Sequence, residues 1–89
     1  MKKIIFIISI ILYLPTFADN PLFIEANHHY NTENYSSAIS LYDSIIENNL
    51  ESSAIYYNLG NCYYKTQDWA NAIWYYDKSL LLKKDINTL

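Results

Sequence analysis

Apolar side chains recur at helical spacing in four stretches of the chain after residue 20. The second stretch shows this best, with spacings of i, i+3, i+4, i+7, i+10 and i+11 at Tyr35, Ala38, Ile39, Tyr42, Ile45 and Ile46. These positions share one face of an α-helix, and the period-two alternation typical of strands is absent. The sequence therefore predicts an all-α fold with four antiparallel helices.

Polar residues mark where each helix should begin and end. Asp19, Asn20 and Pro21 suit the start of a first helix over residues 21–31, and Asn34 is the expected N-cap of the second. Residues 48–53 form a connection ending in a serine that can cap the third helix, and Asp68 precedes the fourth. Buried faces are expected at Leu22, Ala26, His29 and Tyr30; at Tyr56, Leu59, Gly60, Tyr63 and Tyr64; and at Trp69, Ala72, Ile73, Tyr76, Ser79 and Leu80. Lys83 and Lys84 are expected in the last turn of the fourth helix, where cations meet the negative end of its dipole.

The second half of this region repeats the first at a shift of 34 residues. Identical residues superpose at that shift: Asn61 on Asn27, Tyr64 on Tyr30, Thr66 on Thr32, Ala72 on Ala38, Ile73 on Ile39, Tyr76 on Tyr42 and Asp77 on Asp43. A period of this length indicates stacked two-helix repeats. We expect the repeats at residues 19–52 and 53–86, within one domain over residues 19–89.

Small residues mark where the paired helices should approach closely. Gly60 is the only glycine of the chain, and a glycine inside a helix costs about 1 kcal/mol relative to alanine. That cost is understandable if a partner helix presses on the backbone where a Cβ would collide. Ala26, Ala38 and Ala72 are expected to serve the same approach, with tyrosine and tryptophan rings filling the space around them.

Residues 1–18 have the three parts of a secretory signal peptide. Lys2 and Lys3 give a basic start, residues 4–14 are apolar without a charge, and a Thr-x-Ala ending follows. Cleavage after Ala18 predicts an exported protein of the periplasm or cell envelope. Because a membrane span needs about 20 apolar residues, an uncleaved anchor is a second interpretation, and a buried core helix a third. Contact with a membrane is expected only through this segment, if it stays uncleaved.

Charge and chemistry exclude several classes of function. Residues 19–89 have four lysines, nine acidic side chains and no arginine, so nucleic acid is a poor partner. A single glycine rules out phosphate-binding glycine-rich loops, and no nucleophile–base pair is evident, so we expect no enzyme. His28 and His29 point about 100° apart on a helix, so neither a metal site nor another cofactor is expected. Cys62 is alone, which leaves a buried apolar role or a reactive or intermolecularly paired thiol.

The second repeat resembles the tetratricopeptide repeat family. It has the family's aromatic, Leu-Gly, tyrosine, alanine, aromatic and small residues at Tyr56, Leu59, Gly60, Tyr63, Ala72, Tyr76 and Ser79, while Lys84 replaces the usual proline. The first repeat is degenerate, with Leu22, Glu25, Ala26, His29, Ala38 and Tyr42 in the same register. The resemblance implies a superhelix of helical hairpins whose first helices line a concave surface that binds a protein or peptide.

The family's groove positions transfer to nine residues: Phe23, Asn27, Tyr30, Asn31, Tyr57, Asn58, Asn61, Tyr64 and Lys65. Asparagine can donate to and accept from a peptide backbone, and tyrosine offers flat contact area. Asn27 and Asn58 match asparagines of the family's carboxylate clamp, but Phe23 stands where the clamp has a lysine, so a charged clamp is not expected. The alternative is that these side chains only solvate an inner face.

The signal-like segment followed by YYNLGNCYYK and AIWYYDKSLLL also resembles the tetratricopeptide proteins of the Bat aerotolerance operon of Bacteroidetes-type bacteria. That resemblance implies membrane partners with von Willebrand factor A-type domains. We therefore predict an exported scaffold for protein–protein interaction. An alternative is an oligomerisation or assembly segment of a longer, truncated tetratricopeptide membrane protein without peptide binding of its own, and self-association is also open.

Overall fold

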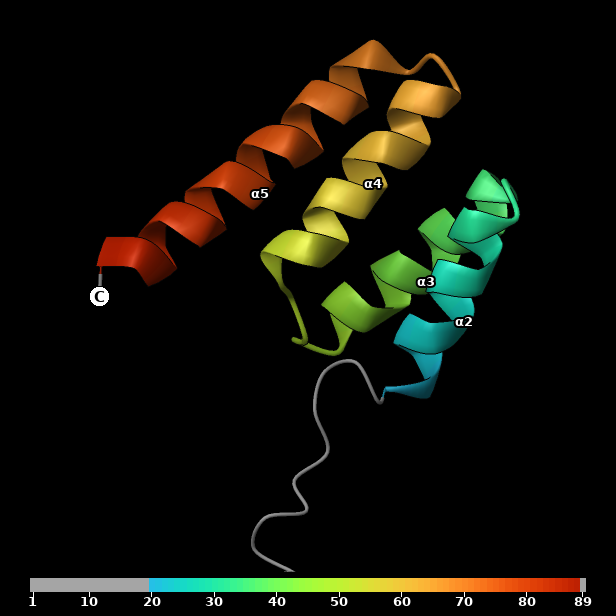
Figure 1. Ribbon diagram of the computed structural model, residues 1–89, viewed down its shortest axis with the longest axis horizontal. Coiled ribbons are helices and arrows are strands. Elements are labelled where there is room, and N and C mark those ends of the chain that lie inside the picture. The colour runs from blue at the N-terminus through green and yellow to red at the C-terminus, as the bar shows by residue number, and fades with distance from the viewer. Residues whose placement is uncertain (1–19, 89) are drawn as a thin grey trace, which may run out of the picture.

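The computed structural model describes residues 20–88, and these residues form four α-helices without a strand. The helices are α2 (Pro21–Asn31), α3 (Tyr35–Glu47), α4 (Ser53–Lys65) and α5 (Trp69–Thr88). Consecutive helices run in opposite directions, and α4 lies between α5 on one side and the α2–α3 hairpin on the other (Figure 1). The all-α, two-hairpin prediction is confirmed; the signal segment lies outside the described residues.

The turn inside each hairpin is built in the same way. The hydroxyl of Thr32 donates to the carbonyls of His28 and His29, and that of Thr66 donates to those of Cys62 and Tyr63. Each threonine is followed by a residue in the left-handed region, Glu33 at φ 64° and Gln67 at φ 66°. The repeated sequence therefore gives a repeated backbone, because the same side-chain and main-chain bonds satisfy the last carbonyls of α2 and α4.

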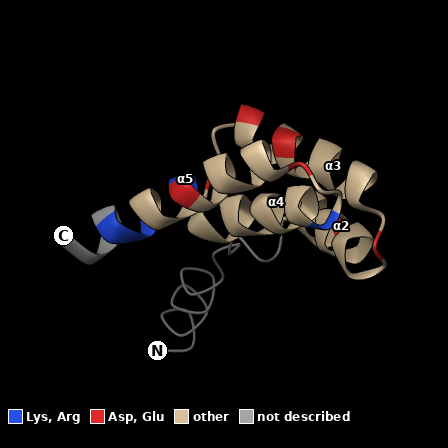
Figure 2. Ribbon diagram, turned by 90° about the horizontal axis from the view of Figure 1, so that it is seen from above, with Lys and Arg blue, Asp and Glu red and all other residues tan. Residues whose placement is uncertain are grey.

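The helices form two layers, with α2 and α4 in one and α3 and α5 in the other (Figure 2). Between them lies a core of fully or almost fully buried side chains: Ala26, Ala38, Tyr42, Ile45, Ile55, Tyr56, Leu59, Cys62 and Ala72. The core lies wholly between residues 26 and 79, with Ser79 also buried.

Gly60 sits where the sequence predicts a close approach. A Cβ added there would lie 2.5 Å from Cδ1 and 2.6 Å from Cε1 of the Tyr76 ring, both far inside van der Waals contact. Ala26, Ala38 and Ala72, the other predicted small positions, are all buried. The Tyr76 ring of α5 therefore packs directly on Gly60, as expected.

Four residues predicted to be buried are exposed instead. Tyr64, Trp69, Ile73 and Leu80 keep 53%, 54%, 62% and 66% of their surface accessible. Their first-repeat counterparts Tyr30, Tyr35, Ile39 and Ile46 are partly buried against the core. The difference has a simple cause: α4 covers the end of the first hairpin, whereas no described helix covers the same end of the second.

Smaller differences concern the helix ends and one core residue. Asn34 precedes α3, but its side chain makes no capping bond and approaches Nδ1 of His29 at 3.3 Å instead. Because α5 continues to Thr88, Lys83 and Lys84 do not lie in its last turn. Ile55 is fully buried, but the sequence analysis did not predict it as a core residue. Its counterpart at the 34-residue shift is Pro21, so the repeat gave no indication that this position is buried.

Candidate functional site

The nine predicted binding residues all lie on α2 and α4, in one layer of the molecule. Four of them are exposed: Asn31, Tyr57, Tyr64 and Lys65. The other five are half-buried: Phe23, Asn27, Tyr30, Asn58 and Asn61. The structure therefore brings the set onto neighbouring helices but divides it into an accessible group and a group held between helices.

The amides of the half-buried group bond to other parts of the chain. The hydroxyl of Tyr42 donates to Oδ1 of Asn27 at 2.5 Å, and Nδ2 of Asn58 donates to the Tyr42 hydroxyl at 3.1 Å. Nδ2 of Asn58 also lies 3.4 Å from Oδ1 of Asn27. These bonds join α2, α3 and α4 across the boundary between the hairpins. Asn58 thus holds the second hairpin on the first.

Asn61 has a similar double role one turn later. Its Nδ2 donates to the hydroxyl of Tyr30 at 2.9 Å, and its Oδ1 accepts from the hydroxyl of Tyr76. The Tyr76–Asn61 bond repeats the Tyr42–Asn27 bond at the 34-residue shift. The sequence analysis predicted that these asparagines bind a peptide backbone, and it missed that they bond to tyrosine hydroxyls of the same chain. The available signal was that both the asparagine and the tyrosine of each pair recur at the 34-residue shift.

The exposed tyrosines of α4 are held by rings of α5. Tyr64 packs edge-on against Trp69 with ring centres 5.2 Å apart, and Tyr57 lies 5.8 Å from Tyr76. The first hairpin has the same contacts, Tyr30 with Tyr35 and Phe23 with Tyr42. Because each exposed ring rests on a second ring, it presents a preformed flat surface rather than a freely rotating side chain.

The accessible part of this layer has little charge. Among the described acidic residues none lies on α4, and Lys65 ends that helix. Asp43 and Glu47 lie on α3 and Asp77 on α5, in the opposite layer (Figure 2). Burial, followed by the nearby Glu47, raises the pKa of Asp43 above its usual value. With one carboxylate, Glu25 on α2, and one lysine, Lys65 on α4, the α2–α4 surface has little net charge and suits contact through rings and amides.

An apolar groove lies between α4 and α5 beside the exposed rings. It has a volume of about 310 Å³ and is lined by Tyr57, Tyr76, Ser79 and Leu80. A neighbouring depression of about 370 Å³ extends it along Ser53, Ala54 and Lys83. The hydroxyl of Ser79 donates to the carbonyl of Ser53 at 2.7 Å, so this polar group is satisfied within the chain.

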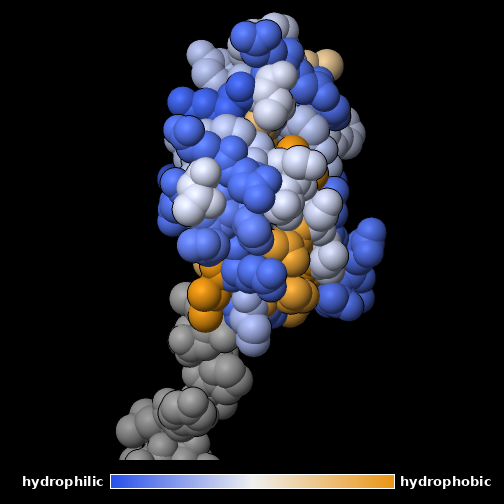
Figure 3. Space-filling view, turned by 90° about the vertical axis from the view of Figure 1, so that its right-hand side faces the viewer, coloured by the Kyte–Doolittle hydropathy of each residue, from blue (hydrophilic) through white to orange (hydrophobic). Residues whose placement is uncertain are grey.

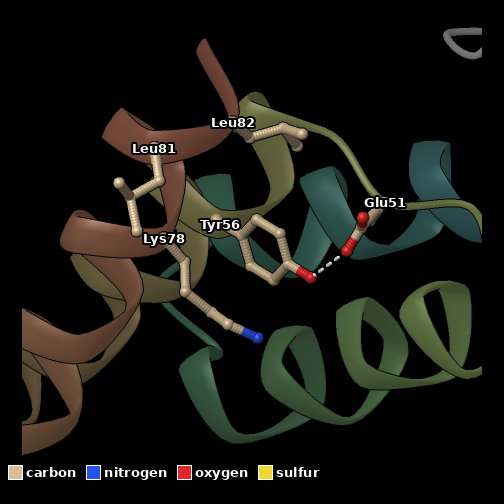
Figure 4. A pocket seen from close by; sticks show the side chains of 5 residues that line it. All are labelled: Glu51, Tyr56, Lys78, Leu81 and Leu82. Atoms are coloured by element: carbon tan, nitrogen blue, oxygen red, sulfur yellow. Dashed lines mark hydrogen bonds between the residues drawn. The ribbon is translucent and has the colours of Figure 1, made fainter. Parts of the chain in front are cut away.

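A second depression lies near the connection between the hairpins, lined by Glu51, Tyr56, Lys78, Leu81 and Leu82 (Figure 4). The Tyr56 hydroxyl donates to the Glu51 carboxylate at 2.5 Å, and Nζ of Lys78 lies 5.1 Å from the centre of the Tyr56 ring. Burial, with a smaller contribution from Glu51, raises the pKa of Tyr56 to about 12. The depression has a volume of about 190 Å³, which is below the range of ordinary ligand pockets. The contacts of Tyr56 with Glu51 and Lys78 inside it stabilise the junction of the two hairpins.

The remaining candidate groups are Cys62 and the two histidines of α2. Cys62 is fully buried and burial raises its pKa to about 11, so the thiolate is disfavoured at neutral pH. No cluster of three or more His, Cys, Asp and Glu side chains occurs in the part of the chain that the structure describes. His28 is exposed and His29 half-buried, with their rings 5.7 Å apart. Within the same residues, no helix has the length and hydropathy needed to cross a membrane.

Comparison with known proteins agrees with the repeated architecture. Neither a curated protein nor a solved structure matches the chain. The family model described as tetratricopeptide repeat matches residues 25–86, which include most of α2 and all of α3 and α4. This match spans well over half of the chain and both hairpins. The chain belongs to the tetratricopeptide repeat family.

Proposed function

We propose that the protein is an exported scaffold that binds a partner protein or peptide on the surface formed by α2 and α4. Tetratricopeptide repeats generally mediate protein–protein interaction. The observation that carries the proposal is the row of accessible side chains on α4, in which Tyr57 and Tyr64 are each supported by a second ring. Rigid, half-exposed aromatic side chains of this kind are typical anchors of interfaces.

The bound segment is expected to be extended, with apolar side chains. Tyr57 and Tyr64 lie two helical turns apart on α4, which allows two side chains of an extended peptide to contact them. Asn31 and Lys65 are exposed at the ends of α2 and α4 and can bond to the peptide backbone or to an acidic side chain. The half-buried asparagines support this surface by fixing α2, α3 and α4 relative to one another.

Export and an envelope location belong to the same proposal. Residues 1–18 have the composition of a secretory signal, and the acidic remainder lacks a basic patch for nucleic acid. The resemblance to tetratricopeptide proteins of the Bat aerotolerance operon suggests membrane partners with von Willebrand factor A-type domains. N-terminal sequencing of exported protein tests the first point, with Asp19 as the expected first residue. Co-purification with such a membrane protein tests the second.

Peptide binding can be tested with residues 19–89 and a displayed library of extended peptides. Selected peptides should bind saturably in fluorescence anisotropy, and the Tyr64→Ala, Lys65→Ala double variant should weaken binding by roughly tenfold or more, as expected for loss of an aromatic anchor. Its helical circular dichroism should stay unchanged, because both side chains are exposed.

The matched control is Trp74→Ala, which removes an equally exposed ring from α5 outside the proposed surface. Its peptide affinity should equal that of the unchanged chain. Failure to select any peptide, or equal loss of affinity in both variants, would refute the α2–α4 surface as the binding site.

An assembly role is the second candidate, and a specific observation favours it. Ile73 and Leu80 leave an apolar end on the second hairpin where the first hairpin is covered by α4. Such an end suits association with further protein.

A further inference from the structure

The exposed end of the second hairpin is the counterpart of a surface that the chain itself buries. On the first hairpin, α4 covers Ile39, Tyr42 and Ile46, and Tyr42 becomes fully buried. At the 34-residue shift the same positions are Ile73, Tyr76 and Leu80, of which Ile73 and Leu80 are exposed. We call Ile73, Tyr76 and Leu80 the open end. The groove of about 310 Å³ beside it therefore corresponds to a packing surface of the first hairpin, and none of the described helices covers it.

The opposite end of the molecule has the reverse character. Ile55, Leu59 and Cys62 of α4 are fully buried, whereas their counterparts on α2 are Pro21, Glu25 and His28, all exposed. The surface over α2 and α3 is accordingly mostly hydrophilic, and its largest apolar area lies in the lower part of the view (Figure 3). Placing this end on the open end of another copy would bury a carboxylate and an imidazole without partners, which is costly. Head-to-tail stacking of copies is thus disfavoured.

The open end needs an apolar cover rather than a polar one. The Tyr76 hydroxyl bonds to Asn61 and the Ser79 hydroxyl to the carbonyl of Ser53, so these two polar groups are satisfied within the chain. The third hydroxyl that lines the groove belongs to the exposed Tyr57. What remains for contact at the open end is the ring surface of Tyr76 and the aliphatic surface of Ile73 and Leu80. A surface of this kind is complementary to itself.

Charges at the two ends of α5 are complementary in a two-fold arrangement, although the exposed Asp77 of each copy lies beside that of the other near the axis. Asp68 precedes the helix, and Lys83 and Lys84 lie four turns later on its exposed side. If two α5 helices cross antiparallel near Tyr76, the lysines of each approach Asp68 of the other, and Leu80 of each approaches Ile73 of the other. The helix dipoles are also opposed in this arrangement.

We propose that the open end is the interface of a two-fold symmetric dimer, in which a second copy of this chain packs its own open end on the groove between α4 and α5. Each copy covers Ile73, Tyr76 and Leu80 of the other. The contact is closed, because the same surface is used on both copies and the hydrophilic α2–α3 ends face outward.

The test measures the mass of residues 19–89 by sedimentation over a wide range of concentrations. The mass should rise from that of the monomer to twice that value and no further. Leu80→Glu should weaken association by roughly a hundredfold or more, because it places an unpaired charge in the contact. Its helical circular dichroism should match the unchanged chain, since Leu80 is exposed in the single copy.

The matched control is Ile24→Glu, which puts the same charge on an exposed aliphatic position of the opposite end. This variant should still dimerise. A monomeric mass at every concentration would show that something other than a second copy covers the open end and would overturn the proposal. Equal weakening by both substitutions, or growth beyond the dimer, would do the same.

A cross-linking experiment tests the arrangement independently of affinity. Asp77→Cys introduces an exposed thiol beside the proposed two-fold axis, whereas Glu25→Cys introduces one at the far end; Cys62 itself is buried. A short bismaleimide should link the Asp77→Cys chains in pairs and leave the Glu25→Cys chains single. The reverse pattern would overturn the antiparallel contact through α5.

Discussion

The packing of single residues explains why a chain with so many rings forms narrow hairpins. Gly60 lets the Tyr76 ring lie against the α4 backbone, and Ala26 holds the equivalent place beside Tyr42. The sequence identified both positions, because a lone glycine inside a helical pattern needs a packing reason. The tyrosine hydroxyls that bond to Asn27 and Asn61 were missed, because the periodicity of one helix does not show which side chains meet between two helices; the recurrence of both Asn and Tyr at the 34-residue shift was the signal that could have indicated them.

Gly60→Leu should destabilise the second hairpin by about 3 kcal/mol or more, a large part of the stability of a small domain. The reason is the 2.5 Å separation that even a Cβ would have from the Tyr76 ring. Urea unfolding followed by circular dichroism measures the loss. Gly60→Ala is the graded control, and its cost should be smaller, because the first repeat accommodates alanine at this position and alanine favours the helix by about 1 kcal/mol. Equal midpoints for Gly60→Leu and the unchanged chain would contradict this packing.

Cys62 should resist alkylation in the folded protein. It is fully buried and burial raises its pKa to about 11, so both access and thiolate content are low at pH 8. Mass spectrometry after iodoacetamide treatment should show an unmodified chain under native conditions and complete modification in denaturant. The sequence left a reactive thiol open as an alternative; rapid modification of the native protein would restore it.

Alkaline pH should destabilise the fold, because it deprotonates buried thiol and phenol groups. Burial raises the pKa of Cys62 from 9.0 to about 11 and those of Tyr42 and Tyr56 from 10.0 to about 12. The folded state binds these protons more tightly than the unfolded state, so the stability they contribute is complete below pH 9 and is lost progressively up to about pH 12. Urea midpoints should therefore be level up to pH 9 and fall steeply above it. Tyr42→Phe should make that fall shallower; an unchanged fall in this variant would contradict the role of Tyr42.

At the level of helices, the positions of the helices and turns were predicted correctly from the sequence, whereas the exposure of several side chains was not. The helix bounds of α2, the threonine turns and the small-residue contacts agree with the repeat of 34 residues. Trp69, Ile73 and Leu80 were expected inside because they continue the helical spacing of the apolar face, but they are exposed. Helical periodicity shows which side of a helix is apolar, but whether a neighbouring element covers that side depends on the arrangement of all the elements. The nine-residue binding surface remains a prediction for the same reason.

The junction of the two hairpins depends on Asn58. Asn58→Ala should cost about 1–3 kcal/mol, because it removes the donor to Tyr42 and leaves polar groups of Asn27 and Tyr42 with one partner fewer. Asn31→Ala, an exposed asparagine on α2, should change stability by no more than about 0.5 kcal/mol. Urea unfolding compares the two. If the costs are equal, the bonds of Asn58 do not hold the hairpins together.

At the scale of the whole molecule, the two ends differ because Glu25 and His28 replace the apolar pair Leu59 and Cys62. Replacing Glu25 and His28 should therefore change how copies of the chain assemble. The Glu25→Leu, His28→Ala variant of residues 19–89 gives α2 an apolar edge like that of α4, and this edge matches the open end of another copy. A contact between unlike ends does not close on itself, so the variant should form chains that lengthen with concentration. Light scattering measures their growth, and Glu47→Leu, which removes an exposed acidic side chain from α3, is the control that should not lengthen. If the control variant forms assemblies of the same length, the growth is due to non-specific hydrophobic association. If the double variant does not assemble, the polarity of α2 does not limit stacking.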